Sequence, residues 1–526
     1  MASNLIAGAL EGARNLGRGA AASVDDQVNA TVIRLAVTGL SRAGKTVFIT
    51  SLIQNLLALG QGRDTLPLIS RRLSAGGGNR LRSVRVVPAG VQTLPHFDFA
   101  EKLAELSADQ PAWPPRTEDL AEISIELEIE RGSVLGRRLG NRRIRLDILD
   151  YPGEWLLDLP LLAQSFLAWS RQTIARLRAP PHRALAQAFL DFHDNAIRPD
   201  DPADDATIRR GHRLYRDAIQ ACRTQLGLRY LQPGRFLCPG PRGDAPFLWF
   251  FPQFPGPAMP RLAMPRAGSA AALLQDRFEA YKREIRDSFF DRNFRSFTRQ
   301  IVLVDVLGGL HAGQASFEDT GHAIADIARG LHDGWGFWSR QRRQSLSAHL
   351  EQGAQLAGAQ LTRRGSPAIG IPLNLAASIL SGFVAQRAIE RVAFVATKAD
   401  HVPAMSRDNL RNLLQALAKP AVLGAGDAKT VVSYHVAASI LSTVDATAPL
   451  GGRNVEVVMG VVMGEQIRRA FYAGSVPSDI PPAAFWSDRY FEMPVFRPPR
   501  IDPSGTLGIA HLGLDEVLDA VIGDLL

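Results

Sequence analysis

The sequence predicts an α/β fold with a mostly parallel sheet, a hairpin edge strand and large helical insertions. Residues 31–38 form a short β-branched run that ends at a glycine. Residues 301–306 and 392–396 are almost uniformly apolar, as expected of strands buried on both faces. Segments with helical spacing separate these runs, and strands that alternate with helices form parallel sheets. Residues 123–129 and 144–149 flank a polar turn, which predicts an antiparallel hairpin at the edge of the sheet.

The helices are predicted from apolar residues that recur every three or four positions. Residues 47–59 directly follow the first strand and have this spacing. Residues 273–297 carry an aromatic stripe, which predicts a packing face and not a cofactor site. Residues 514–525 close the chain with an amphipathic helix. A weaker strand is expected at residues 431–436 and a short one at residues 84–87.

The chain of 526 residues is too long for one ordinary core, so we expect several domains or one domain with large insertions. The predicted division has five parts. They are a weakly amphipathic N-terminal segment (1–30), the first part of the principal domain (31–155), a mostly helical insertion (156–300), the second part of the principal domain with a helical insertion at about 320–390 (301–450), and a C-terminal segment that packs on the core (451–526).

Composition and charge exclude several classes of protein. With 46% hydrophobic and 21% charged residues, the chain has ordinary globular composition. The net charge of +8 suits affinity for phosphate or anionic lipid, but genome composition explains it equally well. Without a recognition motif for RNA or DNA, no nucleic acid is expected as a partner. The two cysteines, Cys222 and Cys238, form no disulfide framework or metal cluster, which predicts the reducing cytoplasm.

One apolar stretch, residues 368–385, resembles a membrane span. Pro372 and Asn374 interrupt it, and its length is at the short end for a spanning helix. A buried helix is the favoured interpretation, while a helix that contacts a membrane and a true span are alternatives. The predicted location is therefore cytoplasmic, with peripheral attachment to the inner face of a membrane left open.

Residues 39–46, Gly-Leu-Ser-Arg-Ala-Gly-Lys-Thr, match the phosphate-loop pattern G-x-x-x-x-G-K-[ST] between an apolar strand and an amphipathic helix. The N–H groups of such a loop point into one concavity, and the helix adds its positive N-terminus. We expect Lys45 to reach the β and γ phosphates and the Thr46 hydroxyl to bind Mg²⁺. The predicted nucleotide contacts in this loop are Gly39, Ser41, Arg42, Ala43, Gly44, Lys45, Thr46 and Val47.

Two D-x-x-G patterns compete for the second phosphate motif. Asp150 and Gly153 follow the strand at residues 144–149, where the aspartate could hold Mg²⁺ through water and the glycine could donate its N–H to the γ phosphate. Asp305 and Gly308 also lie at a strand end. Asp150 is preferred because a hairpin strand precedes it. The alternative for Asp305 is a strand-end aspartate that caps the next turn.

Thr397-Lys398-Ala399-Asp400 follows the strand at residues 392–396 and fits [NT]-K-x-D. We expect Asp400 to accept hydrogen bonds from guanine N1–H and N2–H₂ while the Lys398 stem covers the base. Adenine lacks this pair of donors, so a buried carboxylate selects guanine. Ala438, after the next strand, could donate its N–H to the guanine O6 or could belong to an ordinary strand-to-helix turn.

Thr117, which precedes the strand at residues 123–129, is the candidate for a mobile threonine that completes the Mg²⁺ shell. The alternative is an N-cap for a short turn. With Thr46 and Asp150, this residue makes up the predicted metal site, and the predicted ligands are GTP or GDP with Mg²⁺.

These motifs, in this order, resemble the Ras-like GTPase scheme. The runs at residues 39–57, 113–120, 147–162 and 396–402 are more closely similar to the YcjX-like family of bacterial stress-associated P-loop GTPases, and the resemblance covers most of the chain. It implies a P-loop GTPase-like fold, GTP binding and hydrolysis, and a link to envelope stress. The link to envelope stress follows from the resemblance alone.

Three residues are candidates for catalysis: Arg42, Lys45 and Glu154. Lys45 neutralises phosphate charge. Glu154 stands where Ras-like proteins have a glutamine that orients water, so it either activates water or is a helix-start carboxylate. The loop around Arg42 resembles that of guanylate-binding GTPases, where an arginine at this position acts as an internal finger. The alternative is a surface arginine.

The residues therefore predict an Mg²⁺-dependent protein that binds and hydrolyses GTP, in a regulatory or stress-associated role. The alternative is a nucleotide-stabilised scaffold at a membrane surface that hydrolyses little. The expected partners are guanine nucleotide and either another protein or a membrane surface, while the oligomeric state is left open.

Overall fold

The computed structural model describes most of the chain. The described residues are 30–40, 42–75, 78–88, 94–115, 119–240, 243–253, 265–290, 297–328, 389–423, 430–487, 491–504 and 506–526. Ser41, Thr117 and the apolar stretch 368–385 lie outside this set. Nearly all of the predicted N-terminal segment 1–30 and most of the predicted insertion at about 320–390 lie outside it as well.

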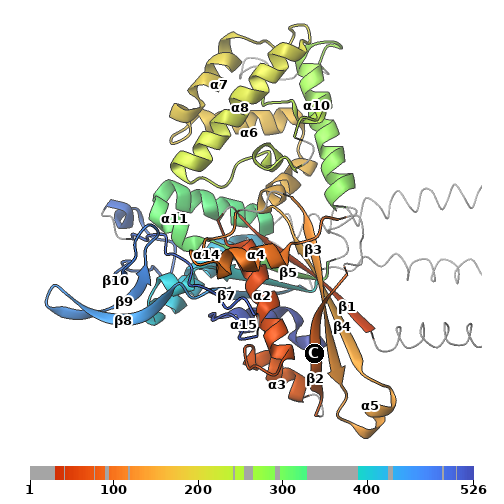
Figure 1. Ribbon diagram of the computed structural model, residues 1–526. Coiled ribbons are helices and arrows are strands. Elements are labelled where there is room, and N and C mark those ends of the chain that lie inside the picture. Colours follow the sequence, from red (N-terminus) through yellow and green to blue (C-terminus); the bar gives the residue numbers. More distant parts are fainter. Residues whose placement is uncertain are drawn as a thin grey trace, which may run out of the picture.

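A sheet of seven strands forms the centre of the described chain (Figure 1). From one edge to the other, the strands are β2 (Arg80–Val87), β3 (Ala121–Glu130), β4 (Arg142–Asp150), β1 (Ala30–Gly39), β5 (Arg299–Val304), β6 (Arg391–Ala396) and β7 (Val431–Val436). The pairs from β4 to β7 are parallel, whereas β2, β3 and β4 pair antiparallel. The predicted α/β class with a mostly parallel sheet is thus confirmed.

The predicted hairpin is confirmed as the antiparallel pair of β3 and β4. Strand β2 extends the sheet beyond β3 and is longer than the short strand expected at residues 84–87. The outermost strand is therefore β2. The polar turn between β3 and β4 contains a short helix, α5 (Val134–Arg138).

Helices cover both faces of the sheet. Besides α5, the helices of the principal domain are α2 (Lys45–Gly60), α3 (Pro67–Ala75), α4 (Phe99–Ser107), α11 (Val306–Ala312), residues 314–328, α14 (Arg407–Leu423) and α15 (Leu514–Ile522). Helical turns of other geometry are η1 (Gly153–Ala163), η3 (Pro246–Leu248), η6 (Ala399–His401), η7 (Ala404–Ser406), η8 (Ala483–Ser487) and η9 (Gly523–Leu525). In the described part of the chain, no helix has the length and apolarity needed to cross a membrane.

The two faces carry separate cores because side chains alternate along each strand. Ile301 and Leu303 of β5 belong to the core that β5 forms with α2, α3 and α15. Val302 and Val304 belong to the opposite core, which includes η1, α11, α14 and the helical insertion. The alternation of β5 thus fixes which helices lie on which face.

The insertion consists of helices joined by proline-rich segments. Its helices are α6 (Phe166–Arg178), α7 (Arg183–Asn195), α8 (Asp205–Leu226), α9 (Gly234–Leu237), α10 (Ala270–Glu284) and the π-helical η4 (Ile285–Phe290). The predicted aromatic stripe on α10 is a packing face, because Leu274, Phe278 and Tyr281 are fully buried. Trp169 of α6 stacks on Phe278 with ring centroids 5.2 Å apart.

A second sheet of three antiparallel strands was not predicted. Its strands are β8 (Thr443–Leu450), β9 (Arg453–Val461) and β10 (Arg468–Phe471), in the order β10-β9-β8. The β8–β9 hairpin extends away from the body of the molecule (Figure 1). The domain boundary predicted between residues 450 and 451 falls in the turn of this hairpin, so the small sheet spans it.

A carboxylate of the C-terminal helix caps the first turn of α3. Asp515 of α15 is 6% exposed, and its two oxygens accept hydrogen bonds from the N–H groups of Leu68 (2.6 Å) and Ile69 (3.3 Å). These N–H groups belong to the first turn of α3, which has no partner for them within its own helix. Asp515 therefore acts as an N-cap supplied from a distant part of the chain.

We expect Asp515→Ala to destabilise the fold by about 1–2 kcal/mol, because it leaves two helix N–H groups without an acceptor. Glu516→Ala is the matched control, since the neighbouring Glu516 is exposed. Urea unfolding followed by circular dichroism measures both. Equal stability of the two variants would contradict the capping role.

Candidate functional site

The strand β1 and the helix α2 are joined by a tight loop. Gly44 precedes α2 with φ 79°, a conformation that favours glycine. Arg42 also has a positive φ of 66°, and the Ala43 N–H donates to the Leu40 carbonyl at 3.1 Å. In the described chain, Arg42 and Lys398 are the only residues other than glycine with a positive φ. Such backbone conformations cluster at functional sites.

Lys45 begins α2 and folds back across this loop. Its Nζ donates to the Gly39 carbonyl at 3.0 Å, and the residue is 8% exposed. Thr46 is equally buried. A buried ammonium and a hydroxyl thus lie at the N-terminus of a 16-residue helix, where the helix dipole favours an anion.

The loop after β4 lies directly against the phosphate loop. A Cβ atom on Gly153 would overlap the carbonyl oxygen of Gly39, so this contact requires a glycine. Asp150, at the end of β4, pairs in register with Val37 of β1 and is 2% exposed. The structure therefore places the D-x-x-G segment of Asp150 and Gly153 against the phosphate loop that begins at Gly39.

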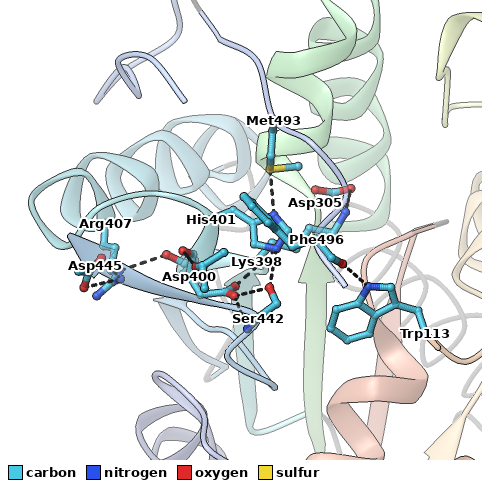
Figure 2. A network of polar contacts seen from close by, with 12 residues as sticks. Trp113, Asp305, Lys398, Asp400, His401, Arg407, Ser442, Asp445, Met493 and Phe496 are labelled. Carbon is cyan, nitrogen blue, oxygen red and sulfur yellow. Dashed lines mark hydrogen bonds and ion pairs between the residues drawn. The ribbon is translucent and has the colours of Figure 1, made fainter. Parts of the chain in front are cut away.

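The second D-x-x-G pattern, at Asp305 and Gly308, has the capping role that was the alternative interpretation of Asp305. The Asp305 carboxylate accepts from the Gly308 N–H at 2.9 Å and caps α11. Its other oxygen accepts from Lys398 Nζ at 2.7 Å (Figure 2). Burial raises the pKa of Asp305, but the Lys398 ammonium and the Arg229 guanidinium outweigh this effect and hold it at about 2.

The donor set near the phosphate loop suits Mg²⁺. Thr46 supplies a hydroxyl and Asp150 a carboxylate, and Mg²⁺ prefers such hard oxygen ligands. Within the described residues, no cluster of three or more His, Cys, Asp and Glu side chains could hold a metal ion. A cation held by few protein ligands, with phosphates and waters completing its shell, is the usual arrangement for Mg²⁺.

Asp400 lies at the end of β6 in a fixed orientation. It is 3% exposed, and its Oδ2 accepts from the Ser442 N–H (2.9 Å) and from the Ser442 hydroxyl (2.7 Å) (Figure 2). His401 Nε2 lies 3.8 Å from its Oδ1 and 3.2 Å from the Ser442 hydroxyl. A carboxylate held this firmly is prepared to accept further hydrogen bonds without reorganising.

The structure disagrees with the predicted role of Ala438. Its N–H donates to the Leu512 carbonyl at 2.9 Å, and its carbonyl accepts from the Leu512 N–H at 2.8 Å. The chain after β7 therefore enters an antiparallel bridge, and this N–H is not available to a base. Ser442, four residues later, contacts Asp400 instead. No spacing in the sequence marks that serine.

Residues 229–238 of the helical insertion form a connecting segment that reaches both ends of the site. At one end, Arg229 donates to the Asp305 carbonyl at 2.9 Å and to its carboxylate at 3.3 Å. Because Asp305 also holds Lys398, the insertion contributes to the position of that lysine. Arg229 is distant in sequence from both residues, so no local pattern could have identified it.

At its other end, the connecting segment packs on the chain that follows Gly153. A Cβ atom on Gly234 would overlap the Glu154 carbonyl, and the Gly234 N–H donates to Asp158 Oδ1 at 2.7 Å. Tyr281 of α10 donates to the other oxygen of Asp158 at 2.6 Å. Burial raises the pKa of Asp158 to about 6, although these donors act in the opposite direction.

Glu154 is 4% exposed and directly follows the glycine that contacts the phosphate loop.

Trp113 was not among the predicted residues, but it packs near Val47 and Ile440 and donates from Nε1 to the Phe496 carbonyl at 2.7 Å. Its indole therefore packs on the same small apolar cluster as Val47 of α2.

Comparison with known proteins gives a consistent result. A model of the YcjX-like family, DUF463, matches residues 33–350 and 372–526. A protein of Escherichia coli K12 named "Ras-like GTPase YcjX" is 33% identical over 497 residues, which are 94% of this chain and 96% of that protein. A protein of Shewanella oneidensis MR-1 with the same name is 30% identical over 513 residues, 94% of each chain.

Gly153→Ala tests the contact between the two loops. The added methyl group must push the loop after β4 away from Gly39, so we expect the affinity for a non-hydrolysable GTP analogue to fall by about 10-fold. The affinity for GDP, which has no γ phosphate, should change little. Gly243→Ala is the control, because its nearest neighbours would lie 3.5 Å from the new atom. Unchanged affinity for the analogue, measured by calorimetry, would refute the predicted contact.

Proposed function

Because this chain belongs to the YcjX-like family, whose matched relatives are named Ras-like GTPases, we propose that it binds GTP with Mg²⁺ and hydrolyses the β–γ phosphoanhydride. We propose a regulatory or stress-associated role for this activity. The observation that carries the proposal is the packing of Gly153 on Gly39, which unites two phosphate-binding patterns at one end of the sheet.

At the phosphate end, the loop N–H groups and Lys45 neutralise the β and γ phosphates. Lys45 exchanges its present hydrogen bond to the Gly39 carbonyl for phosphate oxygens. Thr46 and Asp150 hold Mg²⁺, and Thr117 completes its shell when the γ phosphate is bound. The Gly153 N–H donates to the γ phosphate. The positions of Thr46, Asp150 and Gly153 support these roles, while that of Thr117 rests on sequence.

At the base end, Asp400 accepts from guanine N1–H and N2–H₂, and the stem of Lys398 covers the ring. The two hydrogen bonds from Ser442 support this role, because they fix the carboxylate before the base arrives. An adenine would not offer the buried carboxylate the pair of donors that guanine supplies, at a cost that excludes it. Competition between GTP and excess ATP for the purified protein tests this selectivity directly.

Hydrolysis needs charge stabilisation at the β–γ bridge and an oriented water. Arg42 is exposed on the phosphate loop, and we propose that it swings onto the bridge. Glu154 is buried next to Gly153, where the γ phosphate would lie, and we propose that it orients or deprotonates water.

Asp400→Asn should weaken GDP binding by about 10-fold to 100-fold, because a charged acceptor becomes partly a donor that repels guanine N2–H₂. Xanthosine diphosphate should lose less, since its C2 carbonyl can accept from the new amide. The control is Asp408→Asn, whose side chain is 78% exposed. Equal loss for both diphosphates would show that Asp400 does not face the base.

Arg42→Ala should lower kcat for GTP by roughly 10³-fold, which is the lower range for an arginine finger, and should change GTP affinity much less. Arg183→Ala, at an exposed position of the insertion, is the control. Single-turnover hydrolysis and equilibrium binding measure the two effects separately. Equal loss in both quantities, or no loss, would leave Arg42 a surface residue.

A further inference from the structure

The small sheet has two chemically different faces, which its register defines. Because residues opposite each other in an antiparallel pair point to the same side, each strand contributes alternate residues to each face. We call the face that contains Val444 of β8, Met459 of β9 and Ala470 of β10 the outer face. The opposite face contains Val458 and Phe471, and Phe496 packs against it at Gly460.

The outer face is apolar along the whole hairpin. Strand β8 contributes only valine, alanine and leucine to it, namely Val444, Ala446, Ala448 and Leu450. Their partners on β9 are Met459, Val457, Val455 and Arg453. The side of an antiparallel sheet that faces solvent is normally polar. This face therefore departs from the usual pattern.

Several apolar side chains on this face are exposed to solvent. Val444 is 47% exposed and Leu450 is 53% exposed. The chain at residues 495–497 extends the face, because the Met463 N–H donates to the Val495 carbonyl at 2.8 Å and Val462 bridges Phe496. Met463 is 46% exposed and Val495 is 62% exposed. These side chains expose apolar surface toward the two ends of the face, whereas Val457 between them is 3% exposed.

The charges on the outer face are all positive. Arg453 lies opposite Leu450, and Arg468 lies opposite Val461. Arg497 joins them, because its N–H donates to the Val461 carbonyl at 2.7 Å. No acidic residue occupies the register positions of this face. The acidic residues of the hairpin, Asp445 and Glu456, are both on the opposite face.

A basic hollow adjoins the apolar surface. A pocket of about 270 Å³ is lined by Arg468, Arg497 and Arg500, together with Val444 and Val461 of the outer face. Asp109 also lines it, and this carboxylate is paired with Arg500 at 3.1 Å. The pocket therefore has an excess of positive charge beside exposed apolar side chains. A phosphate group next to hydrocarbon matches this combination.

We propose that the outer face of the small sheet docks on a membrane surface that contains anionic phospholipid. Exposed Leu450, Met463 and Val495 enter the interface between headgroups and acyl chains, and the arginines contact lipid phosphates. The β8–β9 hairpin that carries this face extends away from the body of the molecule (Figure 1). Ser442, which holds Asp400, also lines the basic hollow, but the proposal uses neither Lys45 nor Asp400 and does not depend on nucleotide hydrolysis.

Charge distribution argues against a second copy of the chain as the occupant. In a two-fold interface the same patch faces itself, so Arg453, Arg468 and Arg497 of one copy would face a patch that carries the same three arginines. Their like charges would repel one another without acidic residues to neutralise them. An anionic lipid surface supplies the missing negative charge.

The test measures co-sedimentation of the full-length protein with vesicles of phosphatidylcholine, with and without phosphatidylglycerol. We expect binding only to the vesicles with phosphatidylglycerol, and weaker binding as salt is raised. Each arginine near such a surface strengthens binding by about fivefold, so Arg453→Ala with Arg468→Ala should weaken it by about 25-fold. Thermal unfolding of each variant monitors the fold.

The control variant, Arg469→Ala with Arg183→Ala, removes the same charge from exposed positions outside the outer face and should bind like the native protein. Val495→Asp provides a second variant at an exposed site and should also bind weakly. The proposal is overturned if the native protein ignores anionic vesicles, or if the outer-face and control variants bind alike. A native dimer that Val495→Asp converts to a monomer would instead assign the face to self-association.

Discussion

The carbonyl group of Gly39 is the point on which the candidate site depends. Lys45 donates to it at 3.0 Å, and Gly153 packs against it so closely that a side chain there would overlap it. Gly39 itself has no space for a side chain, because a Cβ atom would lie 2.6 Å from the Leu303 carbonyl of β5. Three segments far apart in sequence therefore meet in close contact at Gly39. This close approach is possible only with glycine at positions 39 and 153.

The helical insertion is joined to this centre by buried carboxylates. Asp158, Asp305 and Asp319 each accept hydrogen bonds from residues 229–238; Asp319, for example, accepts from the Tyr230 N–H at 2.7 Å. Removing any donor would leave a buried carboxylate without one of its hydrogen bonds, so breaking a single contact has a high free-energy cost. A displacement of the chain after Gly153 must therefore be accommodated by the insertion.

The sequence predicted the parts of the structure that local patterns encode. Strands β5 and β6 are buried on both faces and were evident from their composition, and the loop before Lys45 was evident from its glycines. The small sheet was missed because β8 contains Pro449 and its alternation involves small residues. Ser442 and Arg229 were missed because their contacts with Asp400 and Asp305 join distant segments. The prediction for Ala438 failed for the same reason, since Leu512 takes its N–H.

Arg42 and Lys398 show how the fold prepares the site before a ligand binds. Both residues have left-handed backbone conformations, which cost of order 1–3 kcal/mol each outside glycine. For Lys398, the ion pair with buried Asp305 offsets this cost and fixes the side chain. For Arg42, the hydrogen bond from the Ala43 N–H to the Leu40 carbonyl closes the loop around the residue. The strain at Arg42 is thus imposed by the loop. Under the proposed function, phosphate binding offsets this strain, because the loop holds its N–H groups in one concavity.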